Sequence, residues 1–346
     1  MRREIFRQFR DGENDGFKAI LSLSHVCSQW RQELHNMPTL WTVFWAEPWS
    51  CYDWNLVKFV LQKIIRQHPI PFPIQLGFRS NPYSLDFVLE GFSCRITSLG
   101  YGPLVEKGDN SQILLSNHLL SHHLHKLSSH LQVLQLRVVE VPSTLFDGAF
   151  ACLESLFLHT CVFPWRVASL ITLKELTIYD PKERVGWQQI LLVLVHLPLL
   201  EILKLSNALF LDDEEFDISV PTSLAHVHLP FNPPALSTFT LFEYEPRSAV
   251  YLLHKLRFRP DQLKELEVHI EFQPGTSDYS ERRARRSIQR CQNHFERWWG
   301  TPTSTTHPTY IRPQWRYIYG ETKVLLCVDD PFTPSDEEEE EEDGNE

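Results

Sequence analysis

The chain has 346 residues, of which 42% are hydrophobic, so it can bury one large core or two smaller ones. Its formal net charge is −11, but nine acidic residues lie in the last eleven positions, 336–346. The remaining body is nearly balanced, with 33 basic and 35 acidic residues, which argues against a surface built to attract nucleic acid. The run DEEEEEED has no apolar residue to bury, and we expect it to be disordered.

The cysteines and the apolar runs narrow the class of protein further. There are seven cysteines and no Cys-x-x-Cys pair, so neither a disulfide framework nor a zinc module is indicated, and the thiols suggest a reducing compartment. The longest apolar run, ILLVLVHLPLL, is too short to span a bilayer. The sequence therefore predicts a cytoplasmic or nuclear protein with no secretory signal and no membrane partner.

The first 45 residues carry the spacing of short amphipathic helices. Apolar residues at i, i+3, i+4, i+7 and i+11 predict one helix face made of Leu23, Val26, Cys27, Trp30 and Leu34. Ser22 is a candidate cap for this helix, Asn36 a candidate stop, and Pro38 can only begin a new element. Shorter helices are expected around Ile5 and in FKAIL. Each buried tryptophan needs a partner for its indole N–H.

Three separated blocks in this region match a known motif in order: Glu4-Ile5-Phe6, then LSHVCSQWR from Leu23, then MPTLW from Met37. Together they resemble the F-box of fungal F-box proteins. The family's opening Leu-Pro-Pro-Glu segment has no counterpart before Glu4, so the resemblance is to an N-terminally truncated F-box. It implies a helical module that docks on the Skp-type adaptor of an SCF ubiquitin ligase, through the positions that match the family's apolar contact surface: Ile5, Leu23, Val26, Cys27, Trp30, Leu40 and Trp41.

A repeat with apolar residues at n, n+3 and n+5 runs through the middle of the chain. Its six copies begin at Leu131, Leu153, Leu173, Leu200, Leu224 and Leu263, at spacings of 22, 20, 27, 24 and 39 residues. The last two apolar positions share one face of a strand. Helix-like stretches from Pro164 and Trp187 lie between copies, and a helix over 56–66 with a strand from Pro71 precedes them. The array resembles the irregular leucine-rich region of fungal F-box proteins.

The regular repeat of that family has Asn or Cys at n+8. Cys161 and Asn232 fit this position, whereas the other copies have Val139, Pro181, Ala208 and Glu271. We therefore predict an α/β fold in which a short N-terminal helical F-box-like module is followed by an irregular leucine-rich-repeat solenoid. All-α and doubly wound folds are less favoured, because strands alternate with helices but no Gly-rich phosphate loop is present. The expected domains are 1–45 for the module, 46–275 for the solenoid with its joining helix, 276–334 for a helix and strand extension, and 335–346 for the acidic tail.

The residues at n+2 and n+4 are expected to point outward from the sheet. Their mix of apolar, charged and imidazole groups suits recognition of a protein surface better than a small molecule. We expect target binding by Gln135, Phe157, Thr177, Lys204, His228 and Glu267. The alternative is that this face is only solvated.

Other chemical features favour ordinary structural roles. The histidines in NHLLSHHLHKLSSH, from Asn117, have no Cys, Asp or Glu nearby to complete a metal site, and RRARRSIQR, from Arg282, reads as an exposed helix more than as a nuclear localisation or nucleic-acid signal. No nucleophile elbow, zinc-protease motif, Walker loop or Rossmann fingerprint is present.

The sequence thus predicts a non-enzymatic, cofactor-free, substrate-recruiting subunit of an SCF-type ubiquitin ligase. Its partners would be a Skp-type adaptor, the cullin of that complex and an unidentified target protein. Two alternatives stay open: a leucine-rich interaction or structural protein with a non-functional F-box remnant, and a nuclear protein that binds nucleic acid through the basic stretch.

Overall fold

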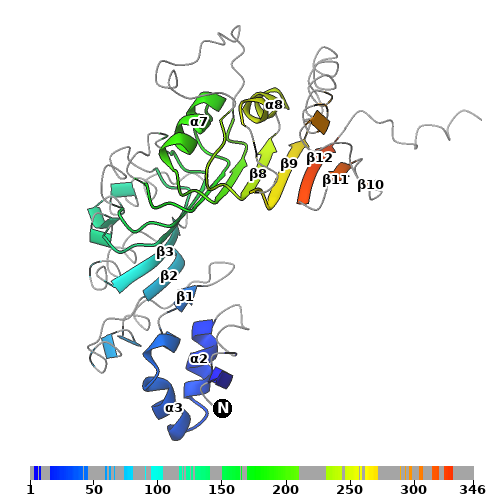
Figure 1. The fold of residues 1–346 in the computed structure, drawn as a ribbon. Helices are drawn as coiled ribbons and strands as arrows, with labels where there is room; N and C mark the ends of the chain where they lie inside the picture. The colour runs from blue at the N-terminus through cyan, green and yellow to red at the C-terminus, as the bar shows by residue number, and fades with distance from the viewer. Residues whose placement is uncertain are drawn as a thin grey trace, which may run out of the picture. The chain divides into compact units, whose positions relative to one another are not determined.

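The structure is a computed structural model of the whole chain, drawn in Figure 1. It describes residues 4–6, 8, 16–41, 43–45, 59, 60, 62, 63, 66, 74–80, 90, 95–103, 117, 118, 120, 122–124, 126, 127, 129–140, 150–163, 165, 170–209, 231–243, 246–256, 258, 262–271, 289, 293, 296, 297, 304–306, 314–318 and 323–329. These residues form two compact units, residues 1–176 with 180–182, and residues 177–179 with 183–346. The finer division at residues 45, 275 and 334 stays a prediction.

The N-terminal helices are α2 (Gly16–Ser24), α3 (Ser28–His35) and the 3-10 helix η1 (Pro38–Trp41). The prediction that one helix carries the apolar face from Leu23 to Leu34 is wrong, because the chain leaves helical geometry between α2 and α3. The apolar spacing predicts which residues are buried, and it gives no information about this break between the two helices. The predicted stop at Asn36 is confirmed, since this residue caps α3, and η1 begins at Pro38 as expected.

The first unit contains five parallel strands that are neighbours in chain order. They are β1 (Val43–Trp45), β2 (Ile74–Ser80), β3 (Ile96–Pro103), β4 (Val133–Arg137) and β5 (Ser155–His159). The helix α2 lies against β1, the first strand of the sheet. The sheet therefore packs directly on the N-terminal helices. The strand β6 (Glu175–Tyr179) spans the boundary between the two units.

The second unit contains helices α7 (Trp187–His196) and α8 (Pro246–Lys255), which contact each other. Strands β7 (Ile202–Ser206), β8 (Thr238–Glu243) and β9 (Glu265–Glu271) are parallel neighbours, and α8 packs against β8 and β9. Strand β12 (Lys323–Asp329) extends this set in parallel beside β9, and β11 (Gln314–Ile318) and β10 (Ser304–Thr306) follow it in antiparallel order (Figure 1).

The core follows the repeat in the sequence. The residues at n, n+3 and n+5 are buried in five of the six predicted copies, those that begin at Leu131, Leu153, Leu173, Leu200 and Leu263. The copy predicted at Leu224 lies outside the described residues. Strand β8 belongs to a copy that the prediction missed, in which Leu236, Phe239 and Leu241 take the three apolar positions and are all buried.

A turn of constant geometry follows four of these strands. The residue at n+7 has positive φ in each case: Val138 at 55°, Thr160 at 54°, Asp180 at 44° and Asn207 at 52°. L-residues, and β-branched ones above all, adopt this conformation at a cost. The next residue, at n+8, is buried in all four copies. The turn is therefore imposed by the packing of its neighbours, because no glycine occupies it.

The predicted fold class, a helical F-box-like module followed by an irregular leucine-rich-repeat solenoid, is wrong. The described residues form a mainly parallel α/β sheet with few helices, and this sheet begins at β1, immediately after η1. Of the two helices expected between repeats, α7 is confirmed, whereas none of the described residues from 165 to 172 is helical. The lack of a Gly-rich loop was the reason for disfavouring a doubly wound fold. That absence bears on nucleotide binding, and it does not bear on whether parallel strands pair.

Candidate protein-interaction surfaces

The corner between α2 and α3 is held by three polar contacts. Cys27 has extended backbone and caps α3, with its Sγ accepting the Trp30 N–H at 3.4 Å. Ser24 donates its hydroxyl to the carbonyl of Leu21 at 2.6 Å, and Arg31 Nε donates to the carbonyl of Ser24 at 2.9 Å. These bonds satisfy backbone groups that a helix end leaves without intrahelical partners. They fix the residues of the corner as a preformed surface.

Trp41 anchors the core beneath this corner. Its ring is 2% exposed, and its indole Nε1 donates to the carbonyl of Leu34 at 2.9 Å. This bond supplies the partner that a buried tryptophan needs. The side chains of Phe6, Ile20 and Leu40 are at most 1% exposed and complete the same core.

Four of the seven predicted adaptor contacts are accessible to a partner. The side chain of Val26 is 61% exposed and that of Ile5 is 38% exposed, and Cys27 is exposed as well. Trp30 is half-buried, with its ring edge-on to Phe6 at a centroid distance of 5.4 Å. We call Ile5, Val26, Cys27 and Trp30 the exposed apolar group.

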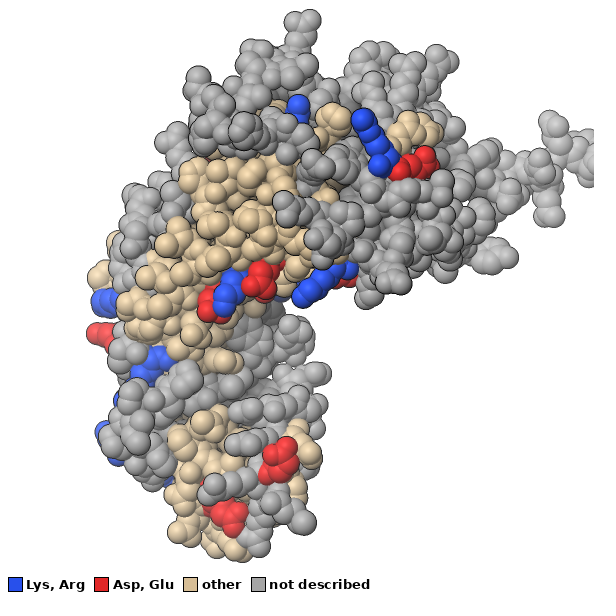
Figure 2. Space-filling view, viewed as in Figure 1, with Lys and Arg blue, Asp and Glu red and all other residues tan. Residues whose placement is uncertain are grey.

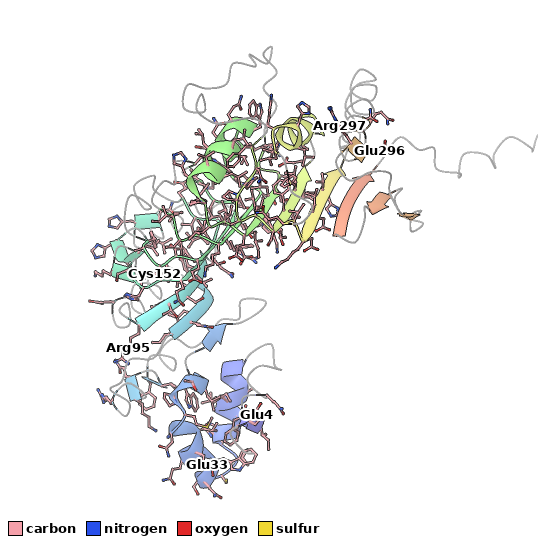
Figure 3. The ribbon with its side chains drawn as sticks, in the orientation of Figure 1. Glu4, Glu33, Arg95, Cys152, Glu296 and Arg297 are labelled. Atoms are coloured by element: carbon pink, nitrogen blue, oxygen red, sulfur yellow. The ribbon has the colours of Figure 1, made fainter. Side chains whose placement is uncertain are left out.

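The other three predicted contacts, Leu23, Leu40 and Trp41, are buried. As placed, they stabilise the helices, and they would touch a partner only after being uncovered. Acidic side chains flank the module: Glu4 and Glu33 both lie on these helices (Figure 3), and the view in Figure 2 shows red carboxylates over them. The accessible part of the module thus has apolar side chains together with charged side chains of both signs, since Arg31 is exposed at the same corner.

In the first unit, two predicted target-binding residues are register partners. Gln135 of β4 lies beside Phe157 of β5, and both are half-buried. The next pair along the same face, Arg137 and His159, was missed by the sequence analysis although n+6 follows n+4 on that face. The Arg137 guanidinium lies 5.5 Å from the Phe157 ring centroid. Burial, and then the charge of Arg137, lower the pKa of His159, while Asp180 opposes the shift.

In the second unit, Lys204 of β7, Thr240 of β8 and Glu267 of β9 share one register row and are half-buried. His269 Nε2 lies 2.7 Å from the Glu267 carboxylate, and the His269 ring is 5.7 Å from that of Phe242. This row therefore offers cationic, hydroxyl and acidic groups side by side. Its composition suits a polar protein surface.

The remaining predicted target-binding residues fare differently. Thr177 is 5% exposed, so little of it can contact a partner. His228 lies outside the described residues. The basic stretch from Arg282 is represented among them by Gln289 alone.

No known protein family matches this sequence, and no curated protein is similar to it. The likeness to F-box proteins therefore rests on the three sequence blocks. Among the described residues, no three His, Cys, Asp or Glu side chains are grouped as metal ligands. Within the same part of the chain, no helix has the length and apolar content that a membrane span requires.

The cysteines of the first unit differ in environment. Cys161, at the n+8 position after β5, is buried, and its thiol donates to the carbonyls of Leu136 at 3.5 Å and His159 at 3.4 Å. Burial raises the pKa of Cys161 to about 11, although nearby backbone hydrogen bonds and Lys182 oppose the shift. This thiol is a structural group, because nucleophilic chemistry at neutral pH needs the thiolate.

Proposed function

We propose that this chain is a substrate-recruiting subunit of an SCF-type ubiquitin ligase, acting in the cytoplasm or nucleus. The observation that carries the proposal is the exposed apolar group on the helices that contain the three F-box-like blocks. Exposed apolar surface can mark a protein docking site, and Val26, Cys27 and Trp30 lie together at the corner between α2 and α3. The Skp-type adaptor would bind there and connect the chain to the cullin.

The chain would contribute proximity and no bond chemistry. A target protein would bind to the outward rows of the sheet, at Gln135 and Phe157 in the first unit and at Lys204 and Glu267 in the second. Holding the target near the ubiquitin-transfer machinery raises the effective concentration of its lysines. The mixed polarity of these rows supports a protein ligand over a small molecule.

The test is a binding titration of the full chain with a Skp-type adaptor. Val26→Asp places a charge at a highly exposed member of the exposed apolar group without disturbing the core, and we expect it to weaken binding at least tenfold. Gln32→Asp adds the same charge at an exposed position of α3 that is not a member of the exposed apolar group, and it should leave the affinity within about twofold.

A second function is favoured by one observation, the burial of Leu23, Leu40 and Trp41. In this alternative the helices only complete the fold of an interaction or structural protein, and the adaptor does not bind. Wild-type chain that shows no adaptor binding at high micromolar concentration, with circular dichroism of a folded protein, would select this alternative and reject the ubiquitin-ligase role.

A further inference from the structure

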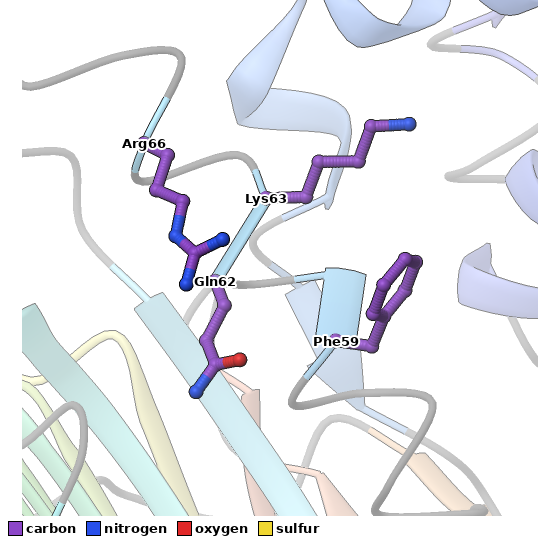
Figure 4. A pocket seen from close by; sticks show the side chains of 4 residues that line it. All are labelled: Phe59, Gln62, Lys63 and Arg66. Atoms are coloured by element: carbon purple, nitrogen blue, oxygen red, sulfur yellow. The ribbon is translucent and has the colours of Figure 1, made fainter.

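A pocket of about 350 Å³ lies in the first unit, and none of its described lining residues belongs to the exposed apolar group or the sheet rows. It is lined by Phe59, Gln62, Lys63 and Arg66 (Figure 4). These residues are helical and stand at i, i+3, i+4 and i+7, so they share one helix face. Its volume is at the lower end of the range that is usual for ligand pockets.

The lining combines an exposed aromatic ring with two cations. Phe59 is 63% exposed, more than any other large hydrophobic residue among those described. Lys63 is half-buried and Arg66 is exposed. In Figure 4, the Lys63 and Phe59 side chains extend to the same side. A ligand with an anionic group next to an apolar group would satisfy both parts of this lining.

Two further observations show that the local charge is positive. The sequence has no acidic residue between Asp53 and Asp86. In addition, the pKa of His35 at the end of α3 is lowered, first by burial and then by the charges of Lys63 and Arg31. The cations of the pocket and of α3 therefore act on the same region.

We propose that this pocket binds an acidic segment of a protein partner, with carboxylates on Lys63 and Arg66 and an apolar side chain on Phe59. The Gln62 amide can bond to the backbone of such a segment. Nucleic acid is disfavoured at this pocket, because its lining has only two cations among the described residues, and the body of the chain is nearly balanced, with 33 basic and 35 acidic residues. This binding is independent of the proposed adaptor contact.

The experiment is a fluorescence-anisotropy titration of the full chain with a labelled peptide, Glu-Leu-Glu-Glu-Leu-Glu, at low and physiological salt. We expect binding that weakens as salt increases. The double variant K63E/R66E should weaken it about tenfold, and F59A several-fold. The matched control K126E reverses an exposed charge outside the pocket and should bind as the wild type does.

Four outcomes would overturn the proposal: no peptide binding by the wild type, unchanged binding by K63E/R66E, equal loss in K126E, or tighter binding of a single-stranded oligonucleotide of the same charge. The last outcome would assign the pocket to nucleic acid. The substituted residues are exposed or half-buried, so circular dichroism should stay that of the wild type. Val26→Asp should not change this titration, which separates a failure here from a failure of the proposed function.

Discussion

The buried carboxylate of Glu243 gives the sharpest prediction about stability. Its residue is 1% exposed, and its Oε1 accepts the N–H groups of Ala208 at 2.8 Å and Leu209 at 3.1 Å. Both donors belong to residues with no exposed surface. The neighbouring Asn207, with φ of 52°, donates its N–H to the carbonyl of Phe242 at 2.9 Å. The end of β8 thus supplies the hydrogen-bond acceptors for the N–H groups of the turn that follows β7.

Glu243→Ala removes the oxygen that accepts both bonds and leaves two buried N–H groups without an acceptor. Each such loss costs about 1–3 kcal/mol, so we expect the free energy of unfolding to fall by roughly 3–5 kcal/mol. Glu243→Gln keeps a carbonyl acceptor and loses only the charge, and it should cost about 1–2 kcal/mol. The control Glu201→Ala removes an exposed carboxylate of the same unit and should change stability by less than about 0.5 kcal/mol.

Urea unfolding of the three variants, with hydrogen exchange of the amides of Ala208 and Leu209, measures these effects. Exchange reports the turn directly, even where the two units unfold in separate steps. The reasoning is refuted if Glu243→Ala stays within about 1 kcal/mol of the wild type, or if Glu201→Ala is equally destabilising.

Three further predictions concern single residues of the first unit. Trp41→Phe removes the indole donor to the carbonyl of Leu34 and should lower the free energy of unfolding by about 1–3 kcal/mol in thermal or urea unfolding. The control Trp30→Phe, at a half-buried site, should lower it by less than about 1 kcal/mol. Equal effects of the two substitutions would contradict the anchoring role of Trp41. Val138→Asn places a residue tolerant of positive φ at the turn and should stabilise the protein by about 0.5–1 kcal/mol, and a loss of stability would mean that valine contacts outweigh the strain. Cys161 should be alkylated far more slowly at pH 8 than Cys27. Folding raises the pKa of the Cys161 thiol from its ordinary value of 9.0 to about 11, so the folded protein keeps the thiol proton between these pH values. The free energy of unfolding should therefore fall as the pH rises from 9 to 11, and Cys161→Ala should flatten this part of the stability-versus-pH profile.

The repeat predicted the strands well, because alternation with a fixed offset reports directly which side chains enter the core. It placed β4, β5, β7 and β9 within a residue or two. It missed β8, although Leu236, Phe239 and Leu241 have the same apolar spacing, with an aromatic ring at the second position. Packing selects volume and burial at that position, and an aromatic ring meets both.

Other features had no signal in the sequence. The break before α3 is capped by Cys27, a residue that is an uncommon helix cap, and the apolar spacing continues across it. The positive φ at Val138 and Thr160 contradicts their local preference and is imposed by tertiary packing. Glu243 accepts the N–H of Ala208 from 35 residues away in the sequence, so no local sequence motif could predict this hydrogen bond.

The division of the predicted adaptor contacts into exposed and buried residues sets a limit on the proposed function. Ile5, Val26, Cys27 and Trp30 together expose on the order of 200–300 Å² of apolar surface, whereas a stable interface buries about 800 Å² on each partner. The exposed apolar group can therefore serve as the centre of an interface but cannot be all of it. The remaining area must come from polar residues around the helices or from Leu23, Leu40 and Trp41 after rearrangement. Because uncovering Trp41 would break its bond to Leu34, the first route costs less, and a functional adaptor contact should leave the core of the helices intact.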